Sequence, residues 1–206
     1  MNDGWQFAAT EIGVSYENAL QEGNWQRVDI PHDFLIADPK NLYKTQTGWY
    51  RRVLPVAKKA GERYILRFDG VYQDSTVFVN DIPVIEWKYG YSTFEADITH
   101  AVKDGENLLV VRAVHQSPNS RWYSGAGIYR NVYFKTVDAV CFASDGIYVT
   151  PVKGDENWQL IIDSEVLADV PFAAEITHTL LDGEGKKVAS CRGETTAEGI
   201  FTLTMR

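Results

Sequence analysis

The chain has 206 residues, with 20 Lys and Arg against 28 Asp and Glu, and its net charge is −8 at pH 7. This charge, together with the lack of any basic run longer than two residues, argues against nucleic acid and anionic membranes as partners. No apolar run is long enough to span a membrane, and Met1–Trp5 has neither the basic nor the apolar region of a signal peptide. We therefore expect a soluble chain. Its compartment is left open: periplasmic or secreted if a signal peptide has been removed, cytoplasmic otherwise.

Composition changes near Val137. Residues 1–137 hold five of the six Trp and ten of the eleven Tyr, whereas residues 138–206 hold 12 acidic against 5 basic residues. A chain of this length can bury a real core in one large or two modest domains. We predict two domains, 1–137 and 138–206.

The first part has the alternation of β-strands. Apolar and polar residues alternate over 64–69, 76–80 and 108–114. Asn80-Asp81 and Asp104-Gly105 are good tight-turn pairs, because these residue types tolerate positive φ. The best helical pattern, at 17–22, is one or two turns long. Short strands with frequent turns predict a β-sandwich or jelly roll.

Aromatic residues also occur between these strands, at Trp87, Tyr89 and Tyr91. They suit a stacking platform for a ligand. Alternating aromatics beside a strand are more often core or cross-strand packing, and we favour that interpretation.

Residues 119–132 lie between two strand-like runs and predict a loop that ends in a strand. Gly125 and Gly127 allow backbone angles that other residues avoid. Its aromatic residues are Trp122, Tyr123 and Tyr129. Left in water, their rings would imply a ligand or a neighbouring domain that covers them, such as a sugar ring. The alternative is a surface loop held in place by its own aromatics.

The second part begins with the strand-like run 145–151. Alternation continues around residues 158–162 and 176–180, up to a turn at 182–185. Cys141 and Cys191 are too few for a disulfide framework, and we expect buried thiols; whether they pair is left open. The four histidines, at 32, 100, 115 and 178, have no metal-ligand spacing. No metal and no cofactor is predicted.

Residues 121–132, Arg-Trp-Tyr-Ser-Gly-Ala-Gly-Ile-Tyr-Arg-Asn-Val, closely resemble the signature that ends the sugar-binding domain of glycoside hydrolase family 2, the β-galactosidase and β-glucuronidase family. Further pieces that resemble this family occur in the family's order at 48–52, 68–71, 77–80, 90–99 and 105–107. The resemblance covers nearly all of residues 4–137, beyond a chance motif match. One departure is Asn80-Asp81, where the family usually has Asn-Gly.

The resemblance implies a galactose-binding-like jelly-roll sandwich over 1–137, followed by an immunoglobulin-like sandwich over 138–206. The second sandwich appears incomplete, because such a domain needs about 100 residues. Its closing strands would then lie beyond Arg206. Without these strands the domain would have an open sheet edge and some exposed apolar core surface. An open edge invites pairing with another chain, so self-association through 138–206, or local disorder near Arg206, is expected.

By resemblance, the chain is the non-catalytic N-terminal region of a retaining β-glycosidase of carbohydrate degradation, with β-galactosidase favoured. Retaining glycosidases need two carboxyl groups about 5 Å apart. In this family both lie on a C-terminal barrel, which this chain is too short to contain, so no catalytic residue is predicted. The implied partners are a carbohydrate and that barrel. The alternative is a free-standing carbohydrate-binding module.

Substrate-binding candidates come from two segments. Residues 30–34, Ile-Pro-His-Asp-Phe, resemble the family's Leu-Pro-His-Asp-Trp, and they offer His32 and Asp33. A carboxylate such as Asp33 can accept hydrogen bonds from two sugar hydroxyls, although both residues suit a purely structural role equally well. Arg121 and Trp122 are weaker candidates, because an Arg–Trp pair also suits a clamp between domains.

Overall fold

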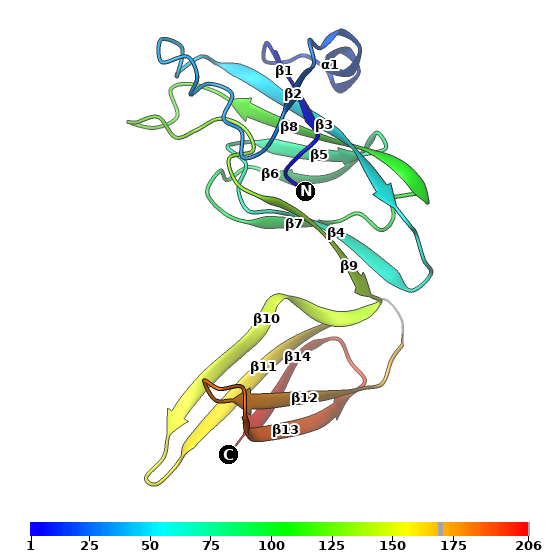
Figure 1. The fold of residues 1–206 in the computed structure, drawn as a ribbon, viewed down its shortest axis with the longest axis vertical. Helices are drawn as coiled ribbons and strands as arrows, with labels where there is room; N and C mark the ends of the chain where they lie inside the picture. Colours follow the sequence, from blue (N-terminus) through cyan, green and yellow to red (C-terminus); the bar gives the residue numbers. More distant parts are fainter. Residues whose placement is uncertain (169–170, 206) are drawn as a thin grey trace. The chain divides into compact units, whose positions relative to one another are not determined.

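The computed structural model describes residues 1–168 and 171–205. Its strands are β1 (Trp5–Thr10), β2 (Gln26–Val28), β3 (Gln46–Val56), β4 (Glu62–Phe68), β5 (Ser75–Val79), β6 (Ile82–Trp87), β7 (Phe94–Asp97), β8 (Gly105–His115), β9 (Val132–Asp138), β10 (Val140–Lys153), β11 (Trp158–Ala168), β12 (Ala174–Leu181), β13 (Lys187–Thr195) and β14 (Gly199–Met205) (Figure 1). The helix α1 (Tyr16–Glu22) is short, as its pattern predicted. The all-β fold class is confirmed. No helix among the described residues is long and apolar enough to cross a membrane.

Backbone contacts divide the chain into two compact units, Met1–Thr136 and Val137–Arg206. The first unit is a sandwich of a six-stranded sheet, in the order β2-β1-β3-β8-β5-β6, and a three-stranded sheet, in the order β7-β4-β9. The buried residues of this unit include Leu66, Phe68, Val77, Val79, Val110 and Val132. Val110 packs on the outer side of the larger sheet with Trp49 and Ala19, where α1 covers it.

Strands β3 and β8 form the longest ladder of the first unit. They pair from Gln46↔His115 to Val56↔Gly105 without a register shift. Because β3 begins where β8 ends, the loop that precedes β3 and the loop that follows β8 leave the sheet at the same end (Figure 1). His115 Nδ1 lies 2.8 Å from the carbonyl oxygen of Lys44, which ties the two loops at their base.

The β5–β6 hairpin turns through Asn80 and Asp81, as predicted. Their φ angles are 49° and 68°, the left-handed conformation that a two-residue hairpin turn requires. The hydroxyl of Tyr16 donates to Asp81 Oδ1 at 2.7 Å and so joins α1 to this turn. Aspartate therefore has a partner here that the family's usual glycine would lack.

The two ends of the first unit meet. Asn2 Nδ2 donates to Asn131 Oδ1 at 2.7 Å, and the backbone N–H of Val132 donates to Asn2 Oδ1 at 3.2 Å. These bonds join the segment before β1 to the start of β9.

The second unit has a three-stranded sheet, in the order β10-β11-β14, and a two-stranded sheet, β12-β13. Its buried apolar residues are Ile162, Val166, Ile176 and Met205. Ile147 and Val149 pair with Ser164 and Ile162, so they share the inward face of β11, yet both are about half exposed. This exposed apolar surface matches the expectation for 138–206. Self-association remains a prediction, and Arg206, near which local disorder was expected, lies outside the described residues.

Both cysteines belong to the second unit. Cys141 on β10 and Cys191 on β13 are thiols, and both are partly buried rather than fully buried as expected.

Candidate functional site

The two segments with site candidates lie side by side. The backbone N–H of His32 donates to the carbonyl oxygen of Ile128 at 2.8 Å, and that of Phe34 donates to the carbonyl oxygen of Ala126 at 3.0 Å. The segment 32–34 therefore follows the segment 126–128 as a short extended pair. We call residues 31–36 and 119–131 together the paired loops.

Asp33 uses one carboxylate oxygen to hold the paired loops. Its Oδ1 accepts hydrogen bonds from the backbone N–H groups of Leu35, at 3.0 Å, and Ile36, at 3.2 Å. The same Oδ1 accepts a hydrogen bond from the hydroxyl of Tyr123. Burial, and then the bond to Asp33, raise the pKa of Tyr123, so its hydroxyl stays protonated and remains a donor. The structural role considered for Asp33 is therefore present.

The second oxygen of Asp33 faces Gly125. A Cβ atom built on Gly125 would lie 3.6 Å from Asp33 Oδ2. Within residues 1–168 and 171–205, the hydrogen bonds of this carboxylate all go to Oδ1. A half-buried carboxylate with one committed oxygen can still accept a ligand hydroxyl on the other.

His32 is held against the core. Its Nδ1 lies 2.9 Å from the hydroxyl of Tyr50, whose burial raises the pKa of that phenol. The His32 ring packs on Phe7 with a centroid distance of 4.9 Å. Burial lowers the pKa of His32, and the negative charge of Asp33 acts in the opposite direction. The imidazole is therefore neutral near pH 7 and anchors one side of the paired loops.

The loop aromatics differ from one another. Trp122 is 66% exposed, and the neighbouring Arg121 is exposed as well. Tyr123 and Tyr129 are only partly exposed; Tyr129 donates from its hydroxyl to the carbonyl oxygen of Gly90 at 2.7 Å. The hydroxyls of Tyr123 and Tyr129 each have a partner within the chain, which fits the alternative of a loop held in place by its own aromatics, whereas the Trp122 ring stays exposed.

A neighbouring loop, residues 88–93, carries two aromatic residues that the sequence pattern predicted to be packed. Tyr89 and Tyr91 are exposed, whereas packing into the core or across strands was favoured for them. Tyr72 was not singled out, yet it exchanges backbone hydrogen bonds with Gly127 at 2.8 and 2.7 Å.

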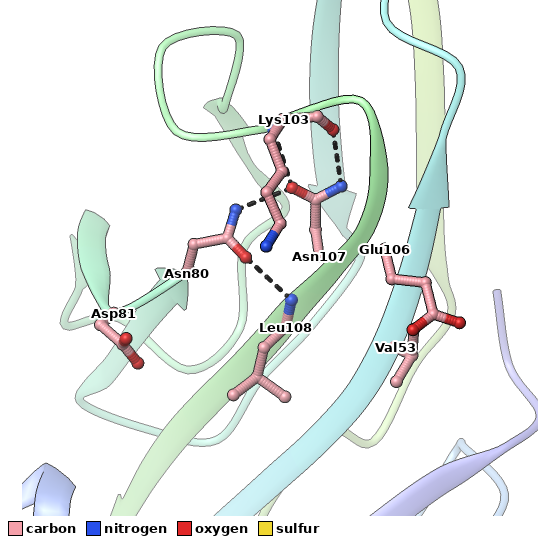
Figure 2. A pocket seen from close by; sticks show the side chains of 7 residues that line it. All are labelled: Val53, Asn80, Asp81, Lys103, Glu106, Asn107 and Leu108. Carbon is pink, nitrogen blue, oxygen red and sulfur yellow. Dashed lines mark hydrogen bonds between the residues drawn. The ribbon is translucent and has the colours of Figure 1, made fainter.

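A hollow of about 360 Å³ opens beside the start of β8 (Figure 2). It is lined by Val53, Asn80, Asp81, Lys103, Glu106, Asn107 and Leu108. Asn80 Nδ2 donates to Asn107 Oδ1 at 2.7 Å, and the backbone N–H of Leu108 donates to Asn80 Oδ1 at 3.0 Å. These amides are occupied by the turn itself, so the paired loops are the better candidate site.

A family model described as the sugar-binding domain of family 2 glycosyl hydrolases matches residues 4–138. A β-galactosidase of Bacteroides ovatus is 33% identical over 96% of this chain, which spans 25% of that protein's length. A solved family 2 glycosyl hydrolase of Bacteroides cellulosilyticus superimposes with a TM-score of 0.82 at 25% identity, covering 100% of this chain and 30% of that one. A β-glucuronidase of Bacteroides uniformis gives 0.80 at 26% identity, covering 99% and 26%.

Proposed function

The chain belongs to glycoside hydrolase family 2, and on that premise we propose that it is a non-catalytic, sugar-binding part of a retaining β-galactosidase. The family match over residues 4–138, on a sandwich whose paired loops carry the site candidates, is the observation that supports this proposal. In this proposal the sugar-binding jelly-roll domain is 1–137, and 138–206 is an immunoglobulin-like domain.

We propose separate roles for the four candidate residues. Asp33 accepts a sugar hydroxyl on Oδ2 while Oδ1 holds the loop. His32 holds residues 31–36 against Tyr50 and Phe7 and does not touch sugar. Trp122 offers its exposed ring, and Arg121 its guanidinium, either to sugar or to the catalytic barrel that completes the enzyme.

The chemistry needs carboxyl groups that the paired loops do not supply. Residues 31–36 and 119–131 contain a single carboxylate, Asp33, and its Oδ1 is already bonded. A retaining mechanism uses two carboxyl groups about 5 Å apart, one as nucleophile and one as acid and base. The paired loops alone therefore cannot perform this step, and because the family resemblance implies a C-terminal barrel that carries both carboxyl groups, we propose that hydrolysis takes place on that barrel.

Two relatives frame the choice of substrate. The Bacteroides ovatus protein is named a β-galactosidase, and the Bacteroides uniformis protein is named a β-glucuronidase. We propose a β-galactoside because the β-galactosidase is the relative at 33% identity. A β-glucuronide is the competing substrate, and its carboxylate would need a cationic partner such as Arg121.

The first prediction tests the non-catalytic role directly. The 206-residue chain, incubated with chromogenic β-galactoside, β-glucuronide and β-mannoside, should release no chromophore above a buffer blank. Turnover that survives further purification would contradict it.

Reading the coding sequence that follows codon 206 tests the larger proposal. A barrel domain with two catalytic glutamates, active on the β-galactoside in the joined protein, is the expected result. A stop codon directly after Arg206 would instead favour a free-standing carbohydrate-binding module.

A further inference from the structure

Tyr89 and Tyr91 form an exposed aromatic corner on the loop between β6 and β7. Tyr89 is 62% exposed and Tyr91 is 48% exposed. Their ring centroids are 5.7 Å apart and their planes are inclined by 68°. At this angle, a ligand stacked on the face of one ring can also contact the other ring. We call this pair the tyrosine corner.

The tyrosine corner rests on an anchored base. Tyr72, which is buried, meets Tyr91 edge-on at a centroid distance of 5.4 Å. Gly90 lies over the Tyr72 ring so closely that a Cβ on Gly90 would come within 2.3 Å of it. The hydroxyl of Tyr129 holds the carbonyl oxygen of Gly90 at 2.7 Å. The backbone between the two exposed rings is therefore fixed before any ligand arrives.

Such a fixed and exposed aromatic pair needs an explanation. Exposed rings forgo the free energy that burial would return, and only one edge of Tyr91 packs against the buried Tyr72. The loop cannot fold over the two rings, because Gly90 at its centre is held against the Tyr72 ring and by the Tyr129 hydroxyl. A ligand that covers one ring face and contacts the other edge would recover that free energy without any loop ordering.

The chemistry of the corner suits a neutral pyranose. A sugar ring has an apolar face of C–H groups that lies flat on an aromatic ring, and hydroxyls around its edge. The Tyr89 hydroxyl can both donate and accept such bonds, whereas the Tyr91 hydroxyl is also hydrogen-bonded to Tyr72, and Ser92 Oγ accepts from Trp87 Nε1 at 3.1 Å. Lys88, beside the corner in the sequence, is paired with Asp74 at 2.6 Å, and the guanidinium of Arg130 lies over the Tyr129 ring at 5.4 Å, so each of these two cations already has a partner within the chain.

We propose that the tyrosine corner binds one pyranose unit of a β-linked oligosaccharide, stacked on Tyr89 or Tyr91. The choice of sugar rests on the proposed function, whereas the site itself rests on the exposure and angle of the two rings. Its occupant is a carbohydrate and not another protein surface, because the corner is small, rigid and polar at its rim.

The experiment is a calorimetric titration of the 206-residue chain with β-1,4-galactotetraose. The wild-type chain should bind with a dissociation constant of about 1 mM or tighter, a range usual for a single stacked sugar. Tyr89→Ala and Tyr91→Ala should each weaken binding by about tenfold, as loss of one stacking ring does. Tyr89→Phe keeps the ring and should stay within about threefold of wild type.

Tyr148→Ala is the matched control. Tyr148 is 69% exposed on β10, so its truncation removes a similar ring from elsewhere on the chain and should leave binding unchanged. Because all three tyrosines are exposed, thermal melting should show the variants folded, with melting temperatures close to that of the wild-type chain.

Three results would overturn the proposal. One is no heat of binding at about 10 mM sugar, a concentration that would reveal even very weak sites. Another is unchanged binding in Tyr89→Ala and Tyr91→Ala, as in the control. Binding that is lost only in Trp122→Ala would count in the same way. The third is self-association of the wild-type chain in sedimentation that Tyr89→Ala abolishes, which would make the corner a protein interface. Hydrolysis by the joined enzyme is read separately, so failure of the proposed function is recognised independently.

Discussion

Gly125 and Gly127 lie in the same loop, and both have positive φ, at 99° and 106°, yet their surroundings differ. A Cβ on Gly127 would come within 2.1 Å of the Tyr50 hydroxyl and 3.0 Å of the His32 carbonyl oxygen. A Cβ on Gly125 would meet only Asp33 Oδ2, at an ordinary 3.6 Å. A side chain at position 125 would therefore suffer backbone strain alone, whereas one at position 127 would suffer both strain and a steric clash.

Gly125→Ala should therefore cost about 1–2 kcal/mol of unfolding free energy, from strain alone. Gly127→Ala adds a clash with a buried phenol and should cost at least about 3 kcal/mol, or prevent folding of the first unit. Urea unfolding of both variants measures the difference. Equal losses would show that the Tyr50 ring moves aside freely, contrary to its complete burial.

Asp33 gives a second prediction at this scale. Asp33→Ala removes the acceptor of two backbone N–H groups and of the Tyr123 hydroxyl, so it should lower the unfolding free energy by about 1–3 kcal/mol. Asp33→Asn keeps an oxygen for these donors and should lose less than half as much. Asp38→Ala is a matched control, because Asp38 bonds to its own loop but is exposed.

Kinetics of the joined enzyme complete this test. If Oδ2 of Asp33 contacts sugar, Asp33→Asn should raise KM or lower kcat although the melting temperature hardly changes. Unchanged kinetics with early melting of Asp33→Ala would restrict Asp33 to holding the loop.

Sequence offered Asp33 and His32 as candidates and marked the glycines of the paired loops, because motif and residue type are local signals. It did not identify Tyr123 as the partner of Asp33, since the two are 90 positions apart and only the fold brings them together. The exposure of Tyr89 and Tyr91 was wrongly assigned for a related reason. Alternation predicts which rings share a side but not whether another layer covers that side.

The β5–β6 hairpin shows how an element departs from its family's pattern. Asp81 has a positive φ that glycine would adopt without strain, but its carboxylate accepts the Tyr16 hydroxyl at 2.7 Å. Asp81→Gly relieves the backbone strain but removes the hydrogen bond to Tyr16. The two effects oppose each other, so the substitution should change the unfolding free energy by less than about 0.5 kcal/mol.

The same substitution in a Tyr16→Phe background should stabilise the protein by about 0.5–1 kcal/mol, because only relief of strain remains. Chemical unfolding of the four proteins in this double-mutant cycle gives the coupling between residues 16 and 81. A coupling near zero would mean that the hydrogen bond contributes nothing, and that aspartate is merely tolerated.

Strands whose residue types alternate in sequence were predictable, and the strand without that alternation was not. β4, β5 and β8 alternate in sequence and were predicted within a few residues. β3 begins with Gln46–Tyr50, five consecutive buried residues, because α1 covers the outer face while the sandwich core covers the inner one. Such a run has no period of two, so only the motif at 48–52 marked it.

At the scale of the whole molecule, the first unit should fold without the second. Deletion of residues 138–206 should leave a cooperative unfolding transition, because the core cluster of the first unit lies wholly within residues 1–137. Phe68 stacks on Phe94 at a centroid distance of 4.9 Å, and Phe68→Ala should cost about 3–5 kcal/mol. The loss should be equal in the deleted and the intact chain.

Near-ultraviolet circular dichroism and urea unfolding measure these values. A deleted chain without a cooperative transition would mean that the first unit depends on residues 138–206, and that the proposed boundary at 137 is misplaced.

The hydrogen bonds of Asn2 to Asn131 and Val132 join positions about 130 apart, and they affect how the chain folds during synthesis. Strand β9 pairs with the edge of β4 and lies among the last residues of the first unit to leave the ribosome. Until it emerges, β4 has an open edge and the apolar interior of the sandwich is accessible to water and to other nascent chains. A ribosome stalled before residue 132 should therefore hold a chain that binds chaperones and is cut readily by protease, whereas stalling some 40 residues later should give a protected first unit.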